Sequence, residues 1–335
     1  MKKKIALVTG GFSGEAVISY KTAKTIYNHL DKELFDVYKI DITQGGWFFE
    51  GENKKTKVDK DDFSIQINGT KTLFDAVFIG IHGTPGEDGK LQGYFDMLGI
   101  PYTSCNASTS AITFNKRYTV AVAAMAGIHV AKSVHIFKHL HYSIDEILST
   151  LKLPLFIKPN NGGSSIGMSK ITEGNQLQAA VDKAFMEDDQ VLIEEMIEGR
   201  EFTIGVFKSG NEIITLPITE VITKKDFFDY QAKYEGMSSE VTPAEISSAW
   251  REQIENAAKK IYTIFDCRSI VRIDFIYNTT YNAPFMLEIN TVPGQSEASI
   301  VPQQVLATGS TLKQFYTTLV QDALKSHSHT VTQPM

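Results

Sequence analysis

Unbroken apolar runs alternate with amphipathic stretches over the first third of the chain. Residues 5–9 and 74–82 are apolar runs that lead into glycine-rich loops, and residues 35–42 are predicted to form a second strand between them. Residues 15–30 carry apolar side chains at helical spacing. Fully buried parallel strands have such runs, and crossover helices join them. We therefore predict an α/β fold that begins with a doubly wound βαβ domain over residues 1–104.

The rest of the chain has a second strand-and-helix pattern, followed by a region rich in predicted strands. Residues 107–127 have the spacing of one long helix, and residues 224–242 are polar and aromatic without periodicity, which is typical of a lid loop. We predict a central lobe over 105–198, a C-terminal lobe over 199–328 and a tail at 329–335, with the last ten residues, 326–335, disordered. The remaining predicted elements are an irregular segment at 47–72, a strand at 152–159, a helix at 174–187, a strand at 190–197, a β-meander at 202–221, a helix at 244–265, strands at 268–277 and 284–289, and a helix at 312–324.

Length, charge and cysteine content narrow the class of protein. The 335 residues exceed one typical domain, and the 42% hydrophobic content can form cores without disulfides or metals. The net charge of -6 argues against nucleic-acid binding, which needs a basic face. Cys105 and Cys267 are far apart in the sequence and fit two reduced thiols. The apolar runs after the first lysines and at 120–131 are too short for a signal peptide or a membrane helix, so we expect a soluble cytoplasmic protein.

A lysine at the end of a predicted strand precedes a glycine- and serine-rich loop, KPNNGGSSIG, at residues 158–167. Backbone N–H groups and hydroxyls in such a loop can surround phosphate oxygens, and Lys158 adds positive charge. This is not a Walker A loop, because the lysine comes before the glycines. A flexible hairpin connection has a similar composition, but the position of the lysine favours a phosphate site.

Polar side chains share one face of the last two predicted strands. Because strand side chains alternate between faces, Arg272 lies on the same face as Asp274, and Glu288 on the same face as Asn290. If the strands pair as a hairpin, Asp274 and Glu288 approach each other, which is unfavourable unless a cation lies between them. Carboxylate and amide oxygens suit Mg²⁺. A solvated polar face is the alternative, but the following turn, with the Gly294 N–H beside the carboxylates, favours a site.

Three other segments carry weaker signals. Glu15 follows a glycine-containing loop and opens a helix, where it either favours the helix dipole or binds a substrate ammonium group. His82 ends a buried strand, at the edge where open α/β sheets bind ligands, and a buried structural histidine is an equal alternative. Glu194 and Glu201 lie in an acidic segment that, taken alone, is typical of a solvated edge strand.

Together and in order, these segments resemble those of the D-alanine–D-alanine ligases, a family of the ATP-grasp superfamily. The resemblance covers about residues 4–325 and rests on GGFSGE, FIGIHGTPGEDGKLQG, NK at 115–116, KPNNGGSSIGMSK, LIEEMIEGREFTIG, DYQAKY, RIDF and LEINTVPGQSEASIVP. It implies that a two-lobed ATP-grasp fold follows the N-terminal domain. It also implies ATP-dependent ligation of two D-alanines through a D-alanyl phosphate, for peptidoglycan precursor synthesis.

The resemblance further implies where ATP and two Mg²⁺ (or Mn²⁺) ions bind. The residues implied for ATP are Lys116, Lys158 and Ser165 at the phosphates, Glu194 and the backbone near Met196 at the adenine, and Glu201 at the ribose. Those implied for the metal ions are Asp274, Glu288 and Asn290.

The same resemblance implies two amino-acid subsites. The residues implied for the first D-alanine are Glu15 at its ammonium group, His82 nearby, and Arg272 with the Gly294 N–H at the oxyanion. Those implied for the carboxylate of the second D-alanine are Lys233, Ser299 and the Ile300 N–H. Glu15, Ser164 and Tyr234 are implied to form a hydrogen-bonded triad that assists deprotonation of the incoming amine.

The chain departs from the family pattern at two places. Ala16 and Val17 stand where the family usually has an arginine and an acid, and residues 295–298 replace the usual Met-Thr and a frequent histidine. The nearest alternative is a D-alanine–D-lactate ligase, but those enzymes tend to lose the tyrosine present here as Tyr234. The segment VTGGFSGE alone suggests a nicotinamide-dependent dehydrogenase, whose Tyr-x-x-x-Lys pair would fall far too early, at residues 20–24. A non-enzymatic nucleotide-binding module would leave the metal face unused. We expect a homodimer, as is common in the family.

Overall fold

The first unit of the fold is built on a mainly parallel sheet. The computed structural model describes residues 1–51, 55–163, 166–223 and 238–330. Strand β1 (Lys3–Gly10) pairs in parallel with β2 (Phe35–Thr43) and β7 (Ala76–Ile79), and helix α1 (Ala16–His29) joins β1 to β2. This confirms the predicted βαβ unit. The segment predicted as irregular contains strands β3 (Gly46–Glu50) and β4 (Lys55–Lys57), which extend the sheet in the order β4-β3-β2-β1-β7, and the small pair β5 (Ile65–Ile67) and β6 (Thr70–Thr72). Helix α2 (Lys90–Leu98) follows the glycine-rich loop after β7.

The long helix predicted at 107–127 is two helices, so that prediction was wrong in one respect. Helix α3 (Ala107–Phe114) ends and α4 (Lys116–Met125) begins around Asn115. Asn115 has extended backbone angles, φ -93° and ψ 105°, and its side-chain oxygen accepts the Tyr118 N–H at 3.1 Å. An asparagine competes for backbone hydrogen bonds in this way, and it therefore starts a new helix where the apolar spacing alone continues the old one.

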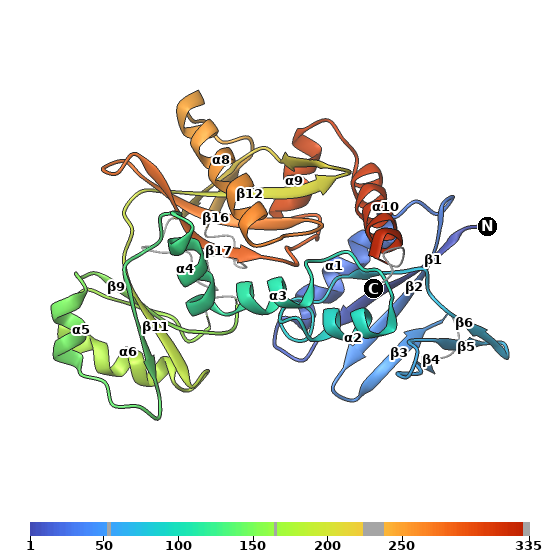
Figure 1. The fold of residues 1–335 in the computed structure, drawn as a ribbon, viewed down its shortest axis with the longest axis horizontal. Helices are drawn as coiled ribbons and strands as arrows, with labels where there is room; N and C mark the ends of the chain where they lie inside the picture. Colours follow the sequence, from blue (N-terminus) through green and yellow to red (C-terminus); the bar gives the residue numbers. More distant parts are fainter. Residues whose placement is uncertain (52–54, 164–165, 224–237, 331–335) are drawn as a thin grey trace.

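The central lobe is a four-stranded antiparallel sheet with helices on one face (Figure 1). Its order is β10 (Ser169–Ile171), β9 (Leu155–Pro159), β11 (Gln190–Glu195) and β8 (Ser133–Phe137). Helices α5 (Ile144–Thr150) and α6 (Leu177–Ala184), the latter preceded by the short 3₁₀ helix η1 (Gly174–Gln176), bury one face of the sheet in a separate hydrophobic core. The opposite face carries Lys158 and Glu194, and it is the face that lines the site described below.

The C-terminal lobe is a second antiparallel sheet, in the order β15-β14-β12-β16-β17 with β13 paired to β12. Its strands are β12 (Arg200–Ser209), β13 (Glu212–Thr215), β14 (Thr219–Thr223), β15 (Ser238–Val241), β16 (Val271–Asn278) and β17 (Ala283–Asn290), and its helices are α8 (Ser248–Ile264), α9 (Ile300–Ala307) and α10 (Leu312–Thr330).

Two boundaries in this lobe differ from prediction. Residues 238–241, expected to belong to the lid loop, form β15 by pairing with β14; residues 224–237 lie outside the described residues. As an edge strand beside a cavity, β15 has no buried apolar face, and so it lacks the alternation that would identify it. Helix α10 runs to Thr330, so the expectation of disorder was wrong for 326–330, where no glycine or proline ends the helix; 331–335 lie outside the described residues.

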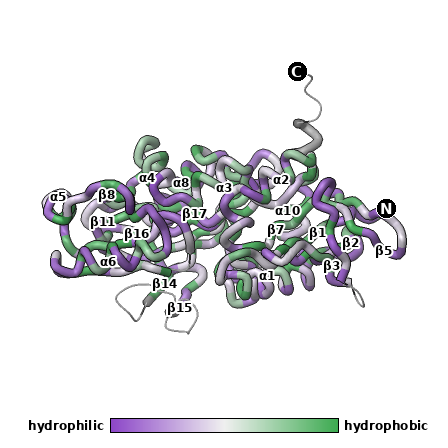
Figure 2. Tube along the Cα trace, turned by 90° about the horizontal axis from the view of Figure 1, so that it is seen from below, coloured by the Kyte–Doolittle hydropathy of each residue, from purple (hydrophilic) through white to green (hydrophobic). Residues whose placement is uncertain are grey.

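The last helix joins the first unit to the C-terminal lobe. Helix α10 contacts β7 of the first unit and β12 of the C-terminal lobe, and Figure 2 shows it beside β7. Tyr316 packs edge-on against Phe78 of β7 at 5.8 Å between ring centroids, and Phe315 packs against Phe207 of β12 at 5.3 Å. The two units therefore share one core, in which Ile5 and Leu7 meet Val301 and Leu319. No helix among the described residues has the length and apolar content to cross a membrane.

Candidate active site

One cavity of about 960 Å³ lies where the three units meet. Every predicted site residue that the structure describes lines it: Glu15, His82, Lys116, Lys158, Glu194, Met196, Glu201, Arg272, Asp274, Glu288, Asn290, Gly294, Ser299 and Ile300. Ser164, Ser165, Lys233 and Tyr234 lie outside the described residues. Side chains separated by more than 250 positions in the sequence thus face one space.

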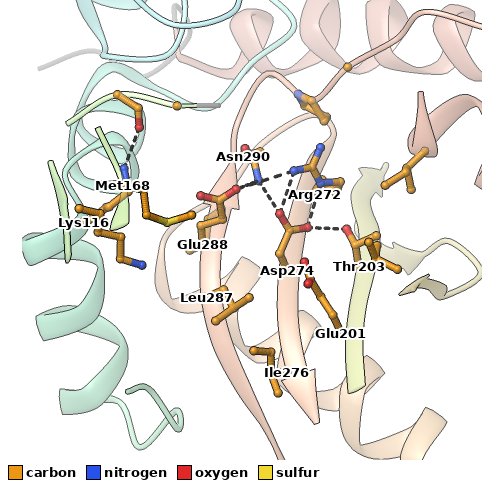
Figure 3. A pocket seen from close by; sticks show the side chains of 18 of the residues that line it. Lys116, Met168, Glu201, Thr203, Arg272, Asp274, Ile276, Leu287, Glu288 and Asn290 are labelled. Atoms are coloured by element: carbon orange, nitrogen blue, oxygen red, sulfur yellow. Dashed lines mark hydrogen bonds and ion pairs between the residues drawn. The ribbon is translucent and has the colours of Figure 1, made fainter. Parts of the chain in front are cut away.

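The polar face predicted on the last two strands exists in the expected register. Strands β16 and β17 form an antiparallel pair in which Asp274 lies opposite Glu288 and Arg272 lies opposite Asn290. Figure 3 shows the four side chains pointing toward one another. Arg272 donates through Nε and a terminal nitrogen to the two oxygens of Asp274, at 2.9 and 2.8 Å, and its guanidinium is 3.9 Å from Glu288 Oε1.

Internal partners hold this acidic pair together. The Asn290 amide nitrogen donates to Asp274 Oδ2 at 3.1 Å and to Glu288 Oε1 at 3.3 Å. Burial opposes the charge of Arg272, but the carboxylates of Asp274 and Glu288 outweigh it and raise the pKa of the guanidinium. The like charges of Asp274 and Glu288 are thus compensated by one cation and one amide.

The donor set fits a hard divalent cation. Two carboxylates and an amide offer the oxygen ligands that Mg²⁺ prefers, once Asn290 turns its oxygen toward the site. Among the described residues, no three His, Cys, Asp or Glu side chains gather as a metal cluster. The predicted metal ligands include only two residues of those types, Asp274 and Glu288, with an asparagine as the third, so such a cluster is not expected here.

Glu15 lies between two glycine loops. A β-carbon on Gly83 would lie 2.6 Å from Glu15 Oε2, and one on Gly163 would lie 2.8 Å from Glu15 Oε1. Gly83 also has a positive φ of 66°, which glycine adopts without strain. These glycines let backbone approach the carboxylate from two units, the N-terminal unit and the central lobe.

His82 is buried and fully engaged by its own neighbours. Its Nε2 is 2.8 Å from Thr22 Oγ1, and its ring also makes a hydrogen bond with the Val292 backbone. The His82 N–H donates to Ser19 Oγ at 3.0 Å. Burial lowers the pKa of His82 to about 4, so the imidazole is neutral at pH 7. The residue therefore braces α1 against the turn after β17, beside the cavity.

Three internal contacts engage residues that the resemblance assigns to the nucleotide. Lys158 of β9 and Glu194 of β11 form an ion pair at 2.5 Å, although the resemblance implied one for phosphate and the other for adenine. Lys116 Nζ donates to the Gly162 carbonyl at 2.7 Å. The Met196 N–H already donates to Pro154 O at 3.0 Å, so this N–H is engaged within the lobe.

A helix begins at the wall of the cavity. Ser299 is the N-cap residue of α9, and Ile300 is the first helical residue. Ser299 Oγ is 2.7 Å from Ser296 Oγ, and a β-carbon on Gly294 would lie 2.8 Å from it. The start of α9 offers backbone N–H groups suited to a carboxylate.

Sequence reasoning missed Glu87. This carboxyl accepts the Gly83 N–H at 2.7 Å and the Val292 N–H at 3.4 Å, and it lines the cavity. Burial, followed by the charges of Glu15 and Glu288, raises the pKa of Glu87 to about 8. The available signal was an acid inside the glycine-rich segment HGTPGEDG, in which the sequence pattern pointed only to His82.

Comparisons with known proteins agree with this geometry. The family model for the D-ala D-ala ligase N-terminus matches residues 4–105, and that for the C-terminus matches 116–321. A D-alanine–D-alanine ligase from Parabacteroides distasonis is 43% identical, covering 97% of this chain and 99% of the relative. A D-alanine–D-alanine ligase from Phocaeicola vulgatus is 42% identical, covering 96% of this chain and 99% of the relative.

Solved structures share the whole fold. D-alanyl-alanine synthetase A from Vibrio cholerae superposes with a TM-score of 0.87 at 27% identity, covering 97% of this chain and 99% of that one. The VanG D-Ala:D-Ser ligase from Enterococcus faecalis gives 0.86 at 30% identity, covering 96% and 100%. A Bacillus anthracis D-alanine–D-alanine ligase complexed with ATP gives 0.79 at 25%, covering 98% and 99%.

The two-lobed fold and its cavity define an ATP-grasp enzyme, an ATP-dependent carbon–nitrogen ligase that uses Mg²⁺. The chain belongs to the D-alanine–D-alanine ligase family, whose members join two D-alanines for peptidoglycan synthesis.

Proposed function

We propose that the cavity holds ATP along the central lobe and two D-alanines toward the N-terminal unit, with reaction at the polar face of β16 and β17. The observation that carries this is the meeting of Glu15, Arg272 and the Asp274–Glu288 pair in one cavity. Glu15 supplies the charge that an amino-acid ammonium needs, and the start of α9 supplies N–H groups for a carboxylate.

The nucleotide subsite is assigned from the two lysine contacts. Lys116 and Lys158 bind phosphate oxygens under the glycine loop, with Ser165. Glu194 and the backbone around Met196 bind the adenine, and Glu201 binds the ribose. The Lys158–Glu194 ion pair supports a site in which ATP replaces an internal partner of each side chain.

The metal ions would be held by Asp274, Glu288 and Asn290. When bound, they neutralise charge on the ATP phosphates and on the transferring phosphoryl group. Among the side chains, Arg272 also neutralises this charge, and its hydrogen bond to Asp274 holds the guanidinium beside the proposed metal ligands.

The chemical steps follow from this placement. The carboxylate of the first D-alanine, whose ammonium is bound by Glu15, takes the γ-phosphoryl group from ATP and forms an acyl phosphate. The amine of the second D-alanine loses a proton with the help of Glu15, Ser164 and Tyr234, attacks the acyl carbon and displaces phosphate. Arg272 and the Gly294 N–H stabilise the oxyanion, and each such donor is typically worth about 3–4 kcal/mol.

The acceptor carboxylate is assigned to Ser299, the Ile300 N–H and Lys233. The hydrogen bond between Ser296 and Ser299 supports this, because it fixes the serine hydroxyl beside the first turn of α9. His82 supports the first subsite from behind. We further propose that the protein acts as a homodimer in the cytoplasm.

The test is an ATP consumption assay. ADP formation should require both D-alanine and a divalent metal. L-alanine should not replace D-alanine, because once Glu15 and Arg272 fix the ammonium and carboxylate groups, the methyl group of the L enantiomer points in a different direction within the cavity. Glu288→Gln should remove turnover by at least about 100-fold, since it halves the charge that faces the metals. Equal ATP hydrolysis with and without D-alanine would refute the proposal.

A second acceptor deserves a direct comparison, because the solved relatives include a D-Ala:D-Ser ligase. Tyr234→Phe should shift products from D-alanyl-D-alanine toward D-alanyl-D-lactate, most clearly below pH 7, because a hydroxy acid has no ammonium proton to lose. Products of a competition between D-alanine, D-serine and D-lactate across pH 6 to 9 can be separated by chromatography. An unchanged product ratio at every pH would remove Tyr234 from acceptor selection.

A further inference from the structure

The first two N–H groups of helix α4 are bonded by Asn160, the residue that follows strand β9. The Lys116 N–H donates to the carbonyl of Asn160 at 3.1 Å, and the Arg117 N–H donates to Asn160 Oδ1 at 2.8 Å. The next two N–H groups, those of Tyr118 and Thr119, are satisfied locally by the side-chain oxygen and the carbonyl of Asn115. The first turn of a helix leaves these groups unpaired, and here one asparagine takes two of them.

Asn160 is the residue that follows β9 and opens the glycine loop. It is 1% exposed, and its own N–H donates to the Gln190 carbonyl at 2.9 Å. The next residue is also fixed, since Asp188 Oδ2 accepts both the Asn161 N–H at 2.7 Å and its side-chain amide at 2.8 Å. The start of the loop is therefore anchored to α4 on one side and to β11 on the other.

The same contacts place the Lys116 side chain. Lys116 follows Asn115 at the start of α4, and its Nζ reaches the Gly162 carbonyl at 2.7 Å. Asn160 therefore fixes the backbone of Lys116, and it also begins the loop whose Gly162 carbonyl the Lys116 side chain reaches. Because Asn160 occupies two N–H groups of α4, the lysine charge rather than the helix terminus is left for an anion.

We propose that Asn160 is a positioning residue for the nucleotide: it sets where the Lys116 ammonium stands relative to the glycine loop. This rests on the proposed function, in which Lys116 and the loop bind ATP phosphates. Asn160 itself contacts no phosphate in this scheme. It acts through the start of α4, so its loss changes nucleotide affinity far more than it changes the D-alanine subsites, whose described residues belong to the other units except for Gly163 beside Glu15.

The test compares two replacements of Asn160. Asn160→Ala removes the acceptor for the Arg117 N–H. Asn160→Asp keeps that acceptor, loses no hydrogen bond of Nδ2, which has no partner among the described residues, and adds a charge that a helix N-terminus favours. The matched control is Asn106→Ala, because Asn106 caps α3 by accepting the Thr109 N–H at 2.8 Å and lies away from the glycine loop.

Three measurements separate positioning from folding. Calorimetry with ADP and Mg²⁺ gives nucleotide affinity without turnover, steady-state kinetics give KM for ATP and for D-alanine, and amide hydrogen exchange reports on residues 116 and 117. We expect Asn160→Ala to weaken ADP binding and raise KM for ATP about tenfold, the size of one lost helix cap. KM for D-alanine and kcat at saturating ATP should stay within about twofold, while the two amides exchange faster.

Asn160→Asp should keep ADP affinity within about threefold of wild type. The control Asn106→Ala should lower thermal stability but leave ADP affinity unchanged. Wild-type ADP affinity in Asn160→Ala, with faster exchange at 116 and 117, would overturn the proposal. So would an Asp variant as weak as the Ala variant. If Asn160→Ala does not fold, Asn160→Ser, with a shorter acceptor, decides in the same way. Wild-type protein that binds no ADP would instead overturn the nucleotide site itself, and this proposal with it.

Discussion

At the scale of single residues, Arg272 and Asn290 satisfy the carboxylates of Asp274 and Glu288 from within the protein. The alternation of strand faces was enough to place Asp274 opposite Glu288. It could not predict that Arg272 and Asn290 would turn inward and satisfy those carboxylates, because partners across a sheet depend on rotamers and burial. Glu87 was not predicted as a site residue for the same reason, because its importance comes from its burial between two loops.

Glu87 leads to a prediction about pH and stability in metal-free protein. The pKa of Glu87 is raised from an ordinary value near 4.5 to about 8, so the folded state keeps a proton that the unfolded state has lost between those values. Stability should therefore fall as pH rises from about 5 to 8, by no more than about 4 kcal/mol, since one pKa unit corresponds to about 1.4 kcal/mol.

Urea unfolding at pH 5, 6.5 and 8 in EDTA can measure this loss. Glu87→Gln keeps an acceptor for the Gly83 N–H but cannot ionise, so its stability should lose less over the same interval. Parallel pH dependences for wild type and variant would mean that Glu87 is already ionised at pH 5.

At the scale of elements, buried strands and amphipathic helices were predictable, and elements defined by partners were not. The buried run of β7 and the helix α8 have strong patterns, and both form, with ends shifted by a few residues. The break at Asn115 depends on a cap, and β15 depends on pairing with β14. Neither a cap nor an edge pairing leaves apolar periodicity in the sequence.

The buried side chain of Gln304 ties helix α9 to the centre of the sheet. Its amide nitrogen donates to the Thr203 carbonyl at 3.0 Å and to Thr219 Oγ1 at 3.1 Å, and its oxygen accepts the Gly205 N–H at 3.0 Å. Gln304→Ala should cost about 3 kcal/mol of unfolding free energy, because buried polar groups lose their partners.

Chemical denaturation can test this with a neighbour as control. Gln303 lies on the same helix and donates to Glu240 of β15 at 2.9 Å, but it is only partly buried, so Gln303→Ala should cost about 1 kcal/mol or less. Because α9 begins with the proposed acceptor clamp, Gln304→Ala should also raise KM for D-alanine more than KM for ATP. Equal losses of stability in the two variants would contradict this view of Gln304.

At the scale of the whole molecule, the hydrophobic cores do not follow the order of the three units along the chain. The N-terminal unit and the C-terminal lobe share a core around α10, whereas the central lobe has a core of its own. Composition and pattern predicted three units, but they could not predict that the last helix would cover the first sheet. That contact joins positions that no local pattern connects.

Two core substitutions should reveal this division. Tyr316→Ala, at a fully buried position against Phe78, should cost about 3–5 kcal/mol and speed amide exchange in both β1 and β12. Leu177→Ala, in the core of the central lobe, should speed exchange in β9 and β11 instead. Faster exchange in β12 without any change in β1 after Tyr316→Ala would show that the two units do not share a core energetically.

The position of α10 at the end of the chain has a consequence for synthesis on the ribosome. Residues Ile5, Leu7 and Phe78 are made early, yet their covering helix is translated last. At about 5–20 residues per second, the roughly 200 residues between the first unit and α10 take about 10–40 s to add. Throughout that interval the nascent N-terminal sheet has an apolar face that α1 covers only in part, which makes it a natural client for chaperones that bind emerging chains.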